Sequence, residues 1–195
     1  MMAITTTEQI EIRWHGRGGQ GAVTSANFLA EAAYYAGFKG VTSAPAFGAE
    51  RRGAPVTAST RLASETLRHF SQVEHPDIIV VLDDSMIKTA NATRGLAENG
   101  YVIVNSRLAP EELDIAGNYR IATADANRIA EEVDLQASGV FMVNTAMLGA
   151  IARATGLITL EHVNKTLANA FSPRAAKKNI EAARLTYEHT QCAFE

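Results

Sequence analysis

The amino-acid sequence predicts an α/β fold: a three-layer, mostly parallel, Rossmann-like sheet with a C-terminal helical extension. Apolar segments of strand length alternate with segments of helical periodicity, which is typical of a parallel sheet covered by helices. Two of these segments are apolar at almost every position, and a glycine-rich turn joins the first strand to the first helix. The 195 residues suffice for one large domain, so we expect a single unit with an α/β core at 10–155 and C-terminal helices at 156–195.

The first strand is expected at 10–14, where β-branched residues alternate with polar ones and a glycine run ends the pattern abruptly. A helix is expected from Ala22 to about Ala36, followed by Gly37, a residue typical of helix C-termini, and by a short strand at 38–43. One face of this helix carries only alanine at helical spacing: Ala22, Ala26, Ala30 and Ala33. Such a face packs close to a sheet, as a strand–turn–helix unit requires.

The remaining elements continue the alternation. We expect strands at 54–62, 78–82, 101–105 and 119–122, and helices at 85–98, 125–132, 139–154, 160–170 and from Pro173 to about Thr190. The strands at 78–82 and 101–105 are almost wholly apolar, which indicates burial on both faces. The helix at 139–154 is apolar nearly all round, so we expect it in the core or beneath a partner, with Asn144 as a buried, hydrogen-bonded amide.

The turn between the first strand and the first helix is the main candidate site. Four glycines occupy six positions, together with an arginine and a glutamine: Gly16, Arg17, Gly18, Gly19, Gln20 and Gly21. Glycine permits positive φ and close approach to the backbone, and the helix start presents unpaired N–H groups with a partial positive charge. We therefore expect this turn to receive an anion or another polypeptide.

The spacing Gly16-x-Gly18-x-x-Gly21 also fits the dinucleotide-binding pattern, and it stands between a strand and a helix as that pattern requires. The pattern further requires an acidic residue about 20 residues later to hold the ribose. Residues 38–43 contain none, and the nearest, Glu50, stands beside two arginines. Three interpretations stay open: bound NAD, a purely structural tight turn, and backbone approach by a partner chain or a partner's ligand.

The two arginines after Glu50, Arg51 and Arg52, form a second candidate segment. Together with Arg17 they would make an anion clamp, because guanidinium groups pair well with phosphate and carboxylate. The alternatives are a solvated loop and an ion pair between Glu50 and one of the arginines. With Phe47 nearby, the segment also suits a protein interface, where arginine and aromatic residues are enriched.

Beyond these segments the chain offers no convincing catalytic residue and no metal site. Asp83 and Asp84 would bind a metal together with Asn105, but acidic residues after a strand more often cap the next helix. The single cysteine, Cys192, excludes an internal disulfide and an iron–sulfur cluster held by this chain alone. We expect His15, beside the glycine turn, to hydrogen-bond locally rather than to catalyse.

The net charge and the hydropathy of the sequence indicate which kinds of partner and which cellular compartment to expect. The formal net charge of −3 argues against nucleic-acid binding, which usually needs a basic surface. Residues 1–9 are polar and threonine-rich and do not resemble a signal peptide. No apolar run reaches the roughly 18 residues that a membrane span needs. Together with the lone cysteine, these features predict a cytoplasmic protein without a membrane span.

Three blocks of the sequence carry a family resemblance. Residues 13–24 contain GRGGQG, residues 48–56 contain ERRG, and residues 144–150 read NTAMLGA. In these blocks, and in their spacing along most of the chain, the sequence resembles the gamma subunit of 2-oxoacid:ferredoxin oxidoreductases, of which the pyruvate enzyme is the best-known member. The segment at 44–49 departs from the more acidic or tyrosine-bearing loop of many relatives, which leaves substrates other than pyruvate open.

The resemblance implies one subunit of a multi-subunit enzyme that decarboxylates a 2-oxoacid oxidatively to an acyl-coenzyme A and passes electrons through iron–sulfur clusters to ferredoxin or NAD. Thiamine diphosphate, Mg, the clusters and coenzyme A would belong to the complex with alpha, beta and delta (ferredoxin-like) subunits, and none to this chain alone. Residues 16–21, Arg51 and Arg52 would form an anion site or an intersubunit seam. A free-standing NAD-binding oxidoreductase and an assembly or regulatory module are the alternatives.

Overall fold

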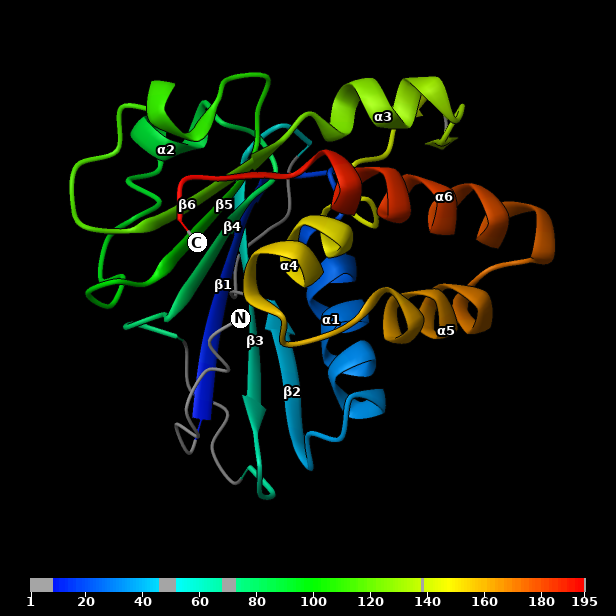
Figure 1. The fold of residues 1–195 in the computed structure, drawn as a ribbon, viewed down its shortest axis with the longest axis horizontal. Coiled ribbons are helices and arrows are strands. Elements are labelled where there is room, and N and C mark those ends of the chain that lie inside the picture. The colour runs from blue at the N-terminus through cyan, green and yellow to red at the C-terminus, as the bar shows by residue number, and fades with distance from the viewer. Residues whose placement is uncertain (1–8, 46–51, 68–72, 138, 195) are drawn as a thin grey trace.

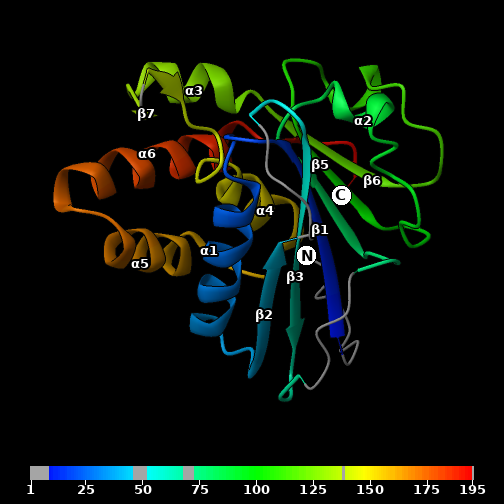
Figure 2. The same ribbon diagram turned by 180° about the vertical axis from the view of Figure 1, so that it is seen from behind.

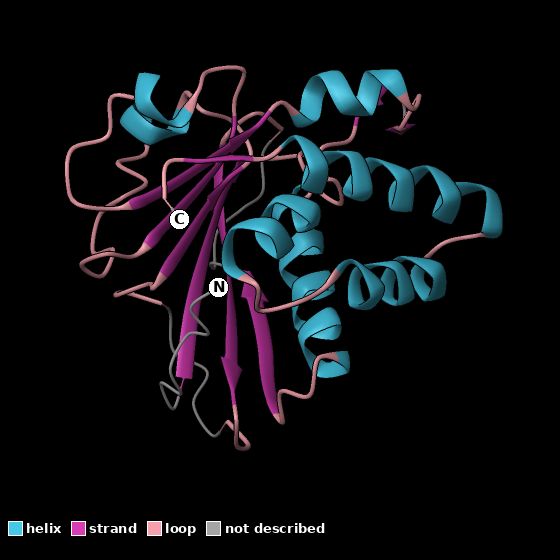
Figure 3. Cartoon of the chain, in the orientation of Figure 1, coloured by secondary structure: helices cyan, strands magenta, loops and turns pink. Residues whose placement is uncertain are grey.

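The computed structural model describes residues 9–45, 52–67, 73–137 and 139–194. The elements alternate much as the sequence predicts (Figures 1 and 3). In chain order they are β1 (Gln9–Arg17), α1 (Ala22–Tyr35), β2 (Gly40–Pro45), β3 (Pro55–Ala63), β4 (Ile78–Val81), α2 (Met86–Thr89), β5 (Tyr101–Asn105), a 3-10 turn (Pro110–Glu112), β6 (Arg120–Ala124), α3 (Ala126–Glu132), β7 (Gln136–Ala137), β8 (Val140–Phe141), α4 (Met147–Thr155), α5 (Leu160–Ala170), α6 (Pro173–His189) and β9 (Gln191–Cys192).

Within the described residues, one seven-stranded sheet has the order β2-β3-β1-β4-β5-β6-β9. The strands β1, β4, β5 and β6 pair in parallel, whereas β3 runs antiparallel between β1 and β2, and β9 runs antiparallel along β6. The prediction of a mixed α/β fold with a mostly parallel sheet is confirmed. The connection through α1 therefore leads from β1 to a strand that is not its neighbour, because β3 fills the place between them.

Helices cover both faces of the sheet and make it a three-layer fold. On one face α1 packs against β1, β2 and β3, α4 packs against β5 and β6, and α5 and α6 lie outside them (Figure 2). On the other face, Met86 of α2 packs on Val81 and Val104. Every residue of β4 and β5 is buried, as their apolar sequences predict. The four alanines of α1 are buried too, at 0–8% exposure, which confirms the close contact with the sheet.

The first strand is longer than predicted. Gly16 and Arg17 continue β1 and pair with Val56 and Pro55 of the antiparallel β3. The glycine run does not end the strand because the partner strand supplies backbone hydrogen-bond partners to residues that have weak strand propensity of their own. The turn itself is consequently reduced to residues 18–21, and its shape depends on β3.

The predicted helix at 85–98 is wrong beyond its first turn. The helix α2 ends at Thr89, and Asn91 adopts a left-handed backbone with φ of 46°. Arg13 of β1 donates from Nη2 to the carbonyl oxygen of Ala92 at 3.0 Å and also to that of Arg94. These carbonyl groups find a tertiary partner instead of helical N–H groups, so the segment forms turns rather than a helix.

The predicted helix at 139–154 is wrong in its first half. Gly139 has a φ of +76°, and Val140 and Phe141 form β8, which pairs with β7 in a small hairpin. Their side chains are 44% and 43% exposed rather than part of the core. The helix α4 begins only at Met147 and is buried along most of its length, as predicted for the second half.

Candidate functional site

The candidate site lies at the carboxyl edge of the parallel strands. The helix after β1 covers one face of the sheet, whereas the helix after β4 covers the other. Adjacent strands whose connections diverge in this way leave a crevice at their carboxyl ends, where open α/β sheets bind ligands. The glycine turn at 18–21 follows β1 at this point, and the segment Asp83–Ser85 follows β4. These two segments are flanked by residues 52–54, which lead into β3.

The glycine turn is joined directly to the second candidate segment. The N–H of Gly18 donates to the carbonyl oxygen of Ala54 at 2.8 Å, and the N–H of Gly53 donates to the carbonyl oxygen of Gly18 at 3.0 Å. Gly18 and Arg52 also form an isolated parallel bridge. The two motifs that the sequence singles out, 29 or more residues apart, are thus neighbours in space. Glu50 and Arg51 lie outside the described residues, as does Phe47.

The turn is held in a strained shape that favours glycine. Gly19 and Gly21 have φ values of +95° and +80°, which L side chains rarely adopt. Gln20 closes the turn: its side-chain Oε1 accepts from the N–H of Arg17 at 2.7 Å, and its own N–H donates to the Arg17 carbonyl oxygen at 2.9 Å. A Cβ added at Gly19 would meet no described atom within 4 Å, so no described residue packs on that side of the turn.

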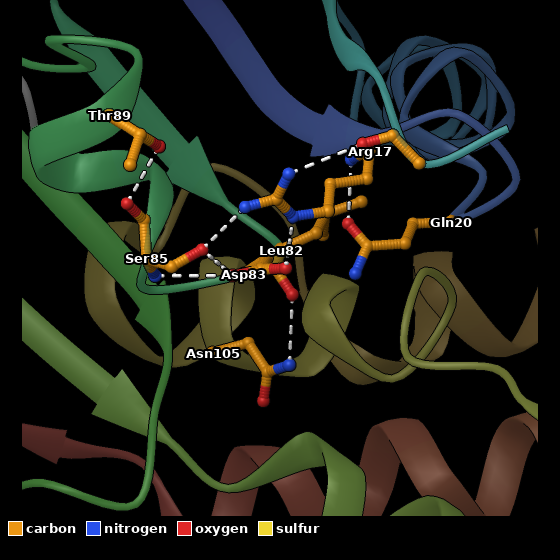
Figure 4. A network of polar contacts seen from close by, with 8 residues as sticks. Arg17, Gln20, Leu82, Asp83, Ser85, Thr89 and Asn105 are labelled. Carbon is orange, nitrogen blue, oxygen red and sulfur yellow. Dashed lines mark hydrogen bonds and ion pairs between the residues drawn. The ribbon is translucent and has the colours of Figure 1, made fainter. Parts of the chain in front are cut away.

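Arg17 does not stand free as the anion clamp that was one interpretation of the sequence. Figure 4 shows its guanidinium group pointing toward Asp83 and Ser85. Its Nε donates to Asp83 Oδ2 at 2.8 Å, its Nη2 to Ser85 Oγ at 2.8 Å and its Nη1 to the Gly53 carbonyl oxygen at 3.2 Å. Arg17 therefore joins the segments after β1, after β4 and before β3. Arg52 is exposed and makes no ion pair with a described residue.

The residues around Asp83 favour its charged form, as the lowered pKa of its carboxyl group indicates. Burial by itself raises the pKa of the carboxyl, but hydrogen bonds from Ser85 and Arg17, with the charge of Arg17, outweigh burial and hold the pKa below its ordinary value. Asp83 also accepts from the N–H of Ser85 at 3.1 Å. The expectation that an acidic residue after the strand caps the next helix is wrong, because Ser85 occupies the N-cap of α2 and no side chain caps that helix, while Asp83 binds Ser85 and Arg17 instead.

We expect Asp83→Asn to lower the free energy of unfolding by about 1 kcal/mol, because it weakens a half-buried ion pair and its hydrogen bonds. Asp114→Asn is the matched control. It removes a carboxylate whose ion pair with Lys88 is 71–83% exposed and screened by solvent, so the free energy of unfolding should not change measurably. Urea unfolding of the two variants provides the measurement, and equal losses would contradict a structural role for the Arg17–Asp83 pair.

The metal interpretation of Asp83, Asp84 and Asn105 gains no support. The amide of Asn105 donates to the Leu82 carbonyl oxygen at 3.0 Å and accepts from the N–H of Ala126 at 3.0 Å, so its oxygen ties β5 to α3. In the part of the chain that the structure describes, no group of three or more His, Cys, Asp or Glu side chains could hold a metal ion.

His15 is buried beside the turn and hydrogen-bonds locally, as predicted. It is 4% exposed, and its Nε2 accepts from Arg13 Nε at 3.1 Å. Burial, and secondarily the charge of Arg13, lower the pKa of His15 to about 4. The ring is therefore neutral near pH 7 with its proton on Nδ1, for which the described residues offer no acceptor.

Asn144 belongs to the site although sequence reasoning placed it only in a core helix. It is 5% exposed, and its backbone oxygen accepts from Ser25 Oγ of α1 at 3.1 Å. Asn144 is buried, as predicted, and its side-chain amide is not among the buried atoms that lack a hydrogen-bond partner, although it bonds no described residue and so reaches solvent. A lone amide within an apolar stretch was the only signal, and its contact with the turn 123 residues away was not predictable from local pattern.

The sheet order and the glycine turn between β1 and α1 define a Rossmann-like α/β domain. Within that class, the chain belongs to the pyruvate ferredoxin/flavodoxin oxidoreductase family, whose model matches residues 11–189. It is 48% identical over 185 residues to the common gamma subunit of the pyruvate/ketoisovalerate oxidoreductases of Pyrococcus abyssi, with 93% of this chain and 97% of the relative covered. The predicted family is confirmed.

Other relatives agree with this assignment. Pyruvate synthase subunit PorC of Methanocaldococcus jannaschii is 43% identical, with 91% of this chain and 95% of the relative covered. The crystal structure of pyruvate oxidoreductase subunit PORC from Thermotoga maritima superposes with a TM-score of 0.83 at 36% identity, covering 96% of this chain and all of that one. The chain is thus a gamma-type subunit of a multi-subunit 2-oxoacid oxidoreductase. No helix among the described residues is long and apolar enough to cross a membrane.

Proposed function

We propose that this chain is the subunit that lends shape and contact surface to oxidoreductase chemistry performed on cofactors in its neighbours. In the reaction, a 2-oxoacid loses carbon dioxide, its acyl group passes to coenzyme A, and two electrons leave through iron–sulfur clusters to ferredoxin or NAD. Thiamine diphosphate, Mg and the clusters reside in alpha, beta and delta (ferredoxin-like) subunits. Such chemistry belongs to the cofactors, while the protein supplies placement and shielding. The complex acts in the cytoplasm, in keeping with a sequence whose single cysteine excludes an internal disulfide.

The proposal rests on one observation: the glycine turn at 18–21 and the segment at 52–54 lie side by side at one edge of the sheet. The backbone bonds between Gly18, Gly53 and Ala54 hold the exposed Arg52 beside a turn on whose outer side no described residue packs. A glycine-lined edge beside the guanidinium group of Arg52, which pairs with no carboxylate of the described residues, suits the phosphates of coenzyme A at a seam between subunits. We assign Gly16, Gly18, Gly19, Gly21, Gln20, Arg51 and Arg52 to this seam, with Arg17 as the residue that holds its segments together.

The alternative of a free-standing NAD-binding enzyme fits the topology poorly. In a dinucleotide-binding unit, the strand after the first helix lies next to β1 and presents the acidic residue that holds the ribose. Here the neighbour of β1 is the antiparallel β3, whose residue opposite Arg17 is Pro55. The place of the ribose-binding carboxylate is thus occupied by a different strand with no acidic side chain at that position.

The test uses the assembled complex. Arg51→Ala combined with Arg52→Ala should raise the apparent KM for coenzyme A by about tenfold, or weaken retention of the partner subunits to a similar extent, because both arginines act at the seam. Arg128→Ala with Lys177→Ala is the matched control: it removes two positive charges from exposed positions on α3 and α6. Unchanged assembly and unchanged KM in the double arginine variant would refute the seam assignment.

A further inference from the structure

The hairpin of β7 and β8 exposes two large apolar side chains that are adjacent in sequence. Val140 is 44% exposed and Phe141 is 43% exposed. Neighbouring residues of a strand point to opposite faces, so each face of the hairpin presents one of these side chains. Gln136 and Ala137, which pair with Phe141 and Val140, are exposed as well. The hairpin therefore projects from the domain with apolar surface on both of its faces.

The base of the hairpin is fixed by hydrogen bonds to α3 and α6, which lie on either side of it (Figures 1 and 2). The N–H of Leu135 donates to the Ala130 carbonyl oxygen at 2.8 Å, and the N–H of Met142 donates to the Leu135 carbonyl oxygen at 2.9 Å. Lys178 Nζ of α6 donates to the backbone oxygen of Asp134 at 2.7 Å and to its Oδ2 at 2.6 Å. A fixed base lowers the entropy cost of binding a partner at the exposed side chains.

An arginine without a carboxylate partner lies beside this base. Arg174 and Lys178 are four residues apart in α6 and so share one face of that helix. The hydrogen bond from Lys178, with a smaller effect from the charge of Arg174, lowers the pKa of the Asp134 carboxyl, so both cations are near the hairpin. Lys178 forms an ion pair with Asp134, whereas Arg174 forms none with a described residue. Residues 162–180 contain no acidic side chain at all.

The position of Arg174 does not favour the helix that carries it. The start of a helix has a partial positive charge, so a cation in the first turn is repelled. The helix α6 begins at Pro173, its first turn has no acidic residue, and the side chain of Ser172 makes no capping hydrogen bond. Helix stability therefore does not account for an arginine here, whereas a carboxylate on a partner surface does.

We propose that the hairpin patch, formed by Val140, Phe141 and Arg174, docks on another subunit of the same complex, in an apolar pocket bordered by carboxylates. The family of this chain supplies the partner, because its members are subunits of a multi-subunit oxidoreductase. Aromatic residues and arginine are enriched at protein interfaces, and such a pocket removes the apolar side chains from water. The inference rests on membership of the complex and not on the assignment of coenzyme A to the seam.

The first variant removes the exposed apolar side chains in the assembled complex. Val140→Ser combined with Phe141→Ser should weaken the binding of this chain to the other subunits by about 30-fold or more, because a buried aromatic anchor carries a large share of interface energy. Tyr34→Ser is the matched control. Tyr34 is 62% exposed at the end of α1, away from the hairpin, and its removal should leave the binding unchanged. Mass photometry of a dilution series of each complex gives the dissociation constant.

The second variant reverses the charge of the patch. Arg174→Glu should weaken the binding by about tenfold, and by more at low salt, because carboxylates then face each other across the interface. A negative charge at the start of α6 favours the helix, so this variant folds and stays informative even if the serine variant has a lower Tm. Lys177→Glu is its control, since it makes the same charge change on α6 near Glu181, and it should weaken the binding by less than about twofold.

A photoreactive p-benzoylphenylalanine at position 141 identifies what covers the patch, and a cross-link to another subunit of the complex supports the inference. A cross-link to a second copy of this chain or to free ferredoxin overturns it, and so does the absence of any cross-link. Binding as tight as that of the parent in the hairpin and Arg174 variants, or equal weakening by the controls, also overturns it. The test of the seam changes Arg51 and Arg52 instead, so either proposal can fail while the other stands.

Discussion

Gly149→Ala is expected to destabilise the protein by about 3 kcal/mol or more and to lower Tm by roughly 10 °C. Gly149 lies in α4 where that helix crosses α6. A Cβ at this position would fall 1.9 Å from the carbonyl oxygen of Ala183 and 2.9 Å from the backbone nitrogen of Tyr187. Both are backbone atoms of a helix, so the overlap is relieved only by moving α6 away from α4, which opens the core between them.

Gly156→Ala is the control for this prediction. Gly156 ends α4 with a φ of +67°, and an added Cβ there meets nothing within 4 Å. This substitution adds backbone strain without a packing clash, so its cost should be about 1 kcal/mol. Thermal and urea unfolding of both variants give the comparison. Equal losses in the two variants would show that α4 and α6 do not approach each other so closely.

The stability of the chain is expected to fall by about 3 kcal/mol as the pH decreases from 6.5 to about 4, through His15 alone. Burial and the charge of Arg13 lower the pKa of this imidazole from 6.5 to about 4. Between these values the unfolded chain takes up a proton that the folded chain does not, so unfolding is favoured. Above pH 6.5 the ring is neutral in both states, and the full stability is present.

His15→Gln isolates this effect, because a neutral amide can still accept from Arg13 but takes up no proton. The free energy of unfolding of the variant should lack the pH dependence that His15 gives the parent between pH 4 and 6.5. It should therefore fall less steeply with decreasing pH than that of the parent. His75→Gln, at an exposed position, is the control and should retain the parental slope. Parallel curves for the parent and His15→Gln, measured by urea unfolding at several pH values, would contradict a buried neutral imidazole.

The features that the sequence predicts well are those with a strong local signal. The alanine face of α1 and the apolar β4 and β5 were predictable because their burial follows from periodicity alone. The last two helices, α5 and α6, begin within one residue of the expected positions, where Thr159 caps α5 and Pro173 starts α6. The glycine turn and the family followed from motifs whose residues are close in sequence.

The features that sequence reasoning missed depend on contacts between distant residues. The place of β3 between β1 and β2 is decided by pairing, which local propensity does not indicate. Asn91 and the turns after α2 depend on the guanidinium group of Arg13, 78 or more residues earlier. The engagement of Arg17 by Asp83 joins residues separated by 66 positions. All three contacts join residues that are far apart in the sequence, so no local pattern indicates them.

The short strand β9 limits how this subunit can associate with others. Gln191 and Cys192 occupy the outer side of β6, and the ring of Phe194 stacks edge-on against Tyr101 behind them. β9 is itself the last strand on that side, and it is only two residues long, so it offers few backbone groups to which a partner chain could add a strand. At the opposite side, β2 has no strand paired to its outer edge within the described residues. A partner chain that continues the sheet across a subunit boundary therefore finds a six-residue edge at β2 and only a two-residue edge at β9.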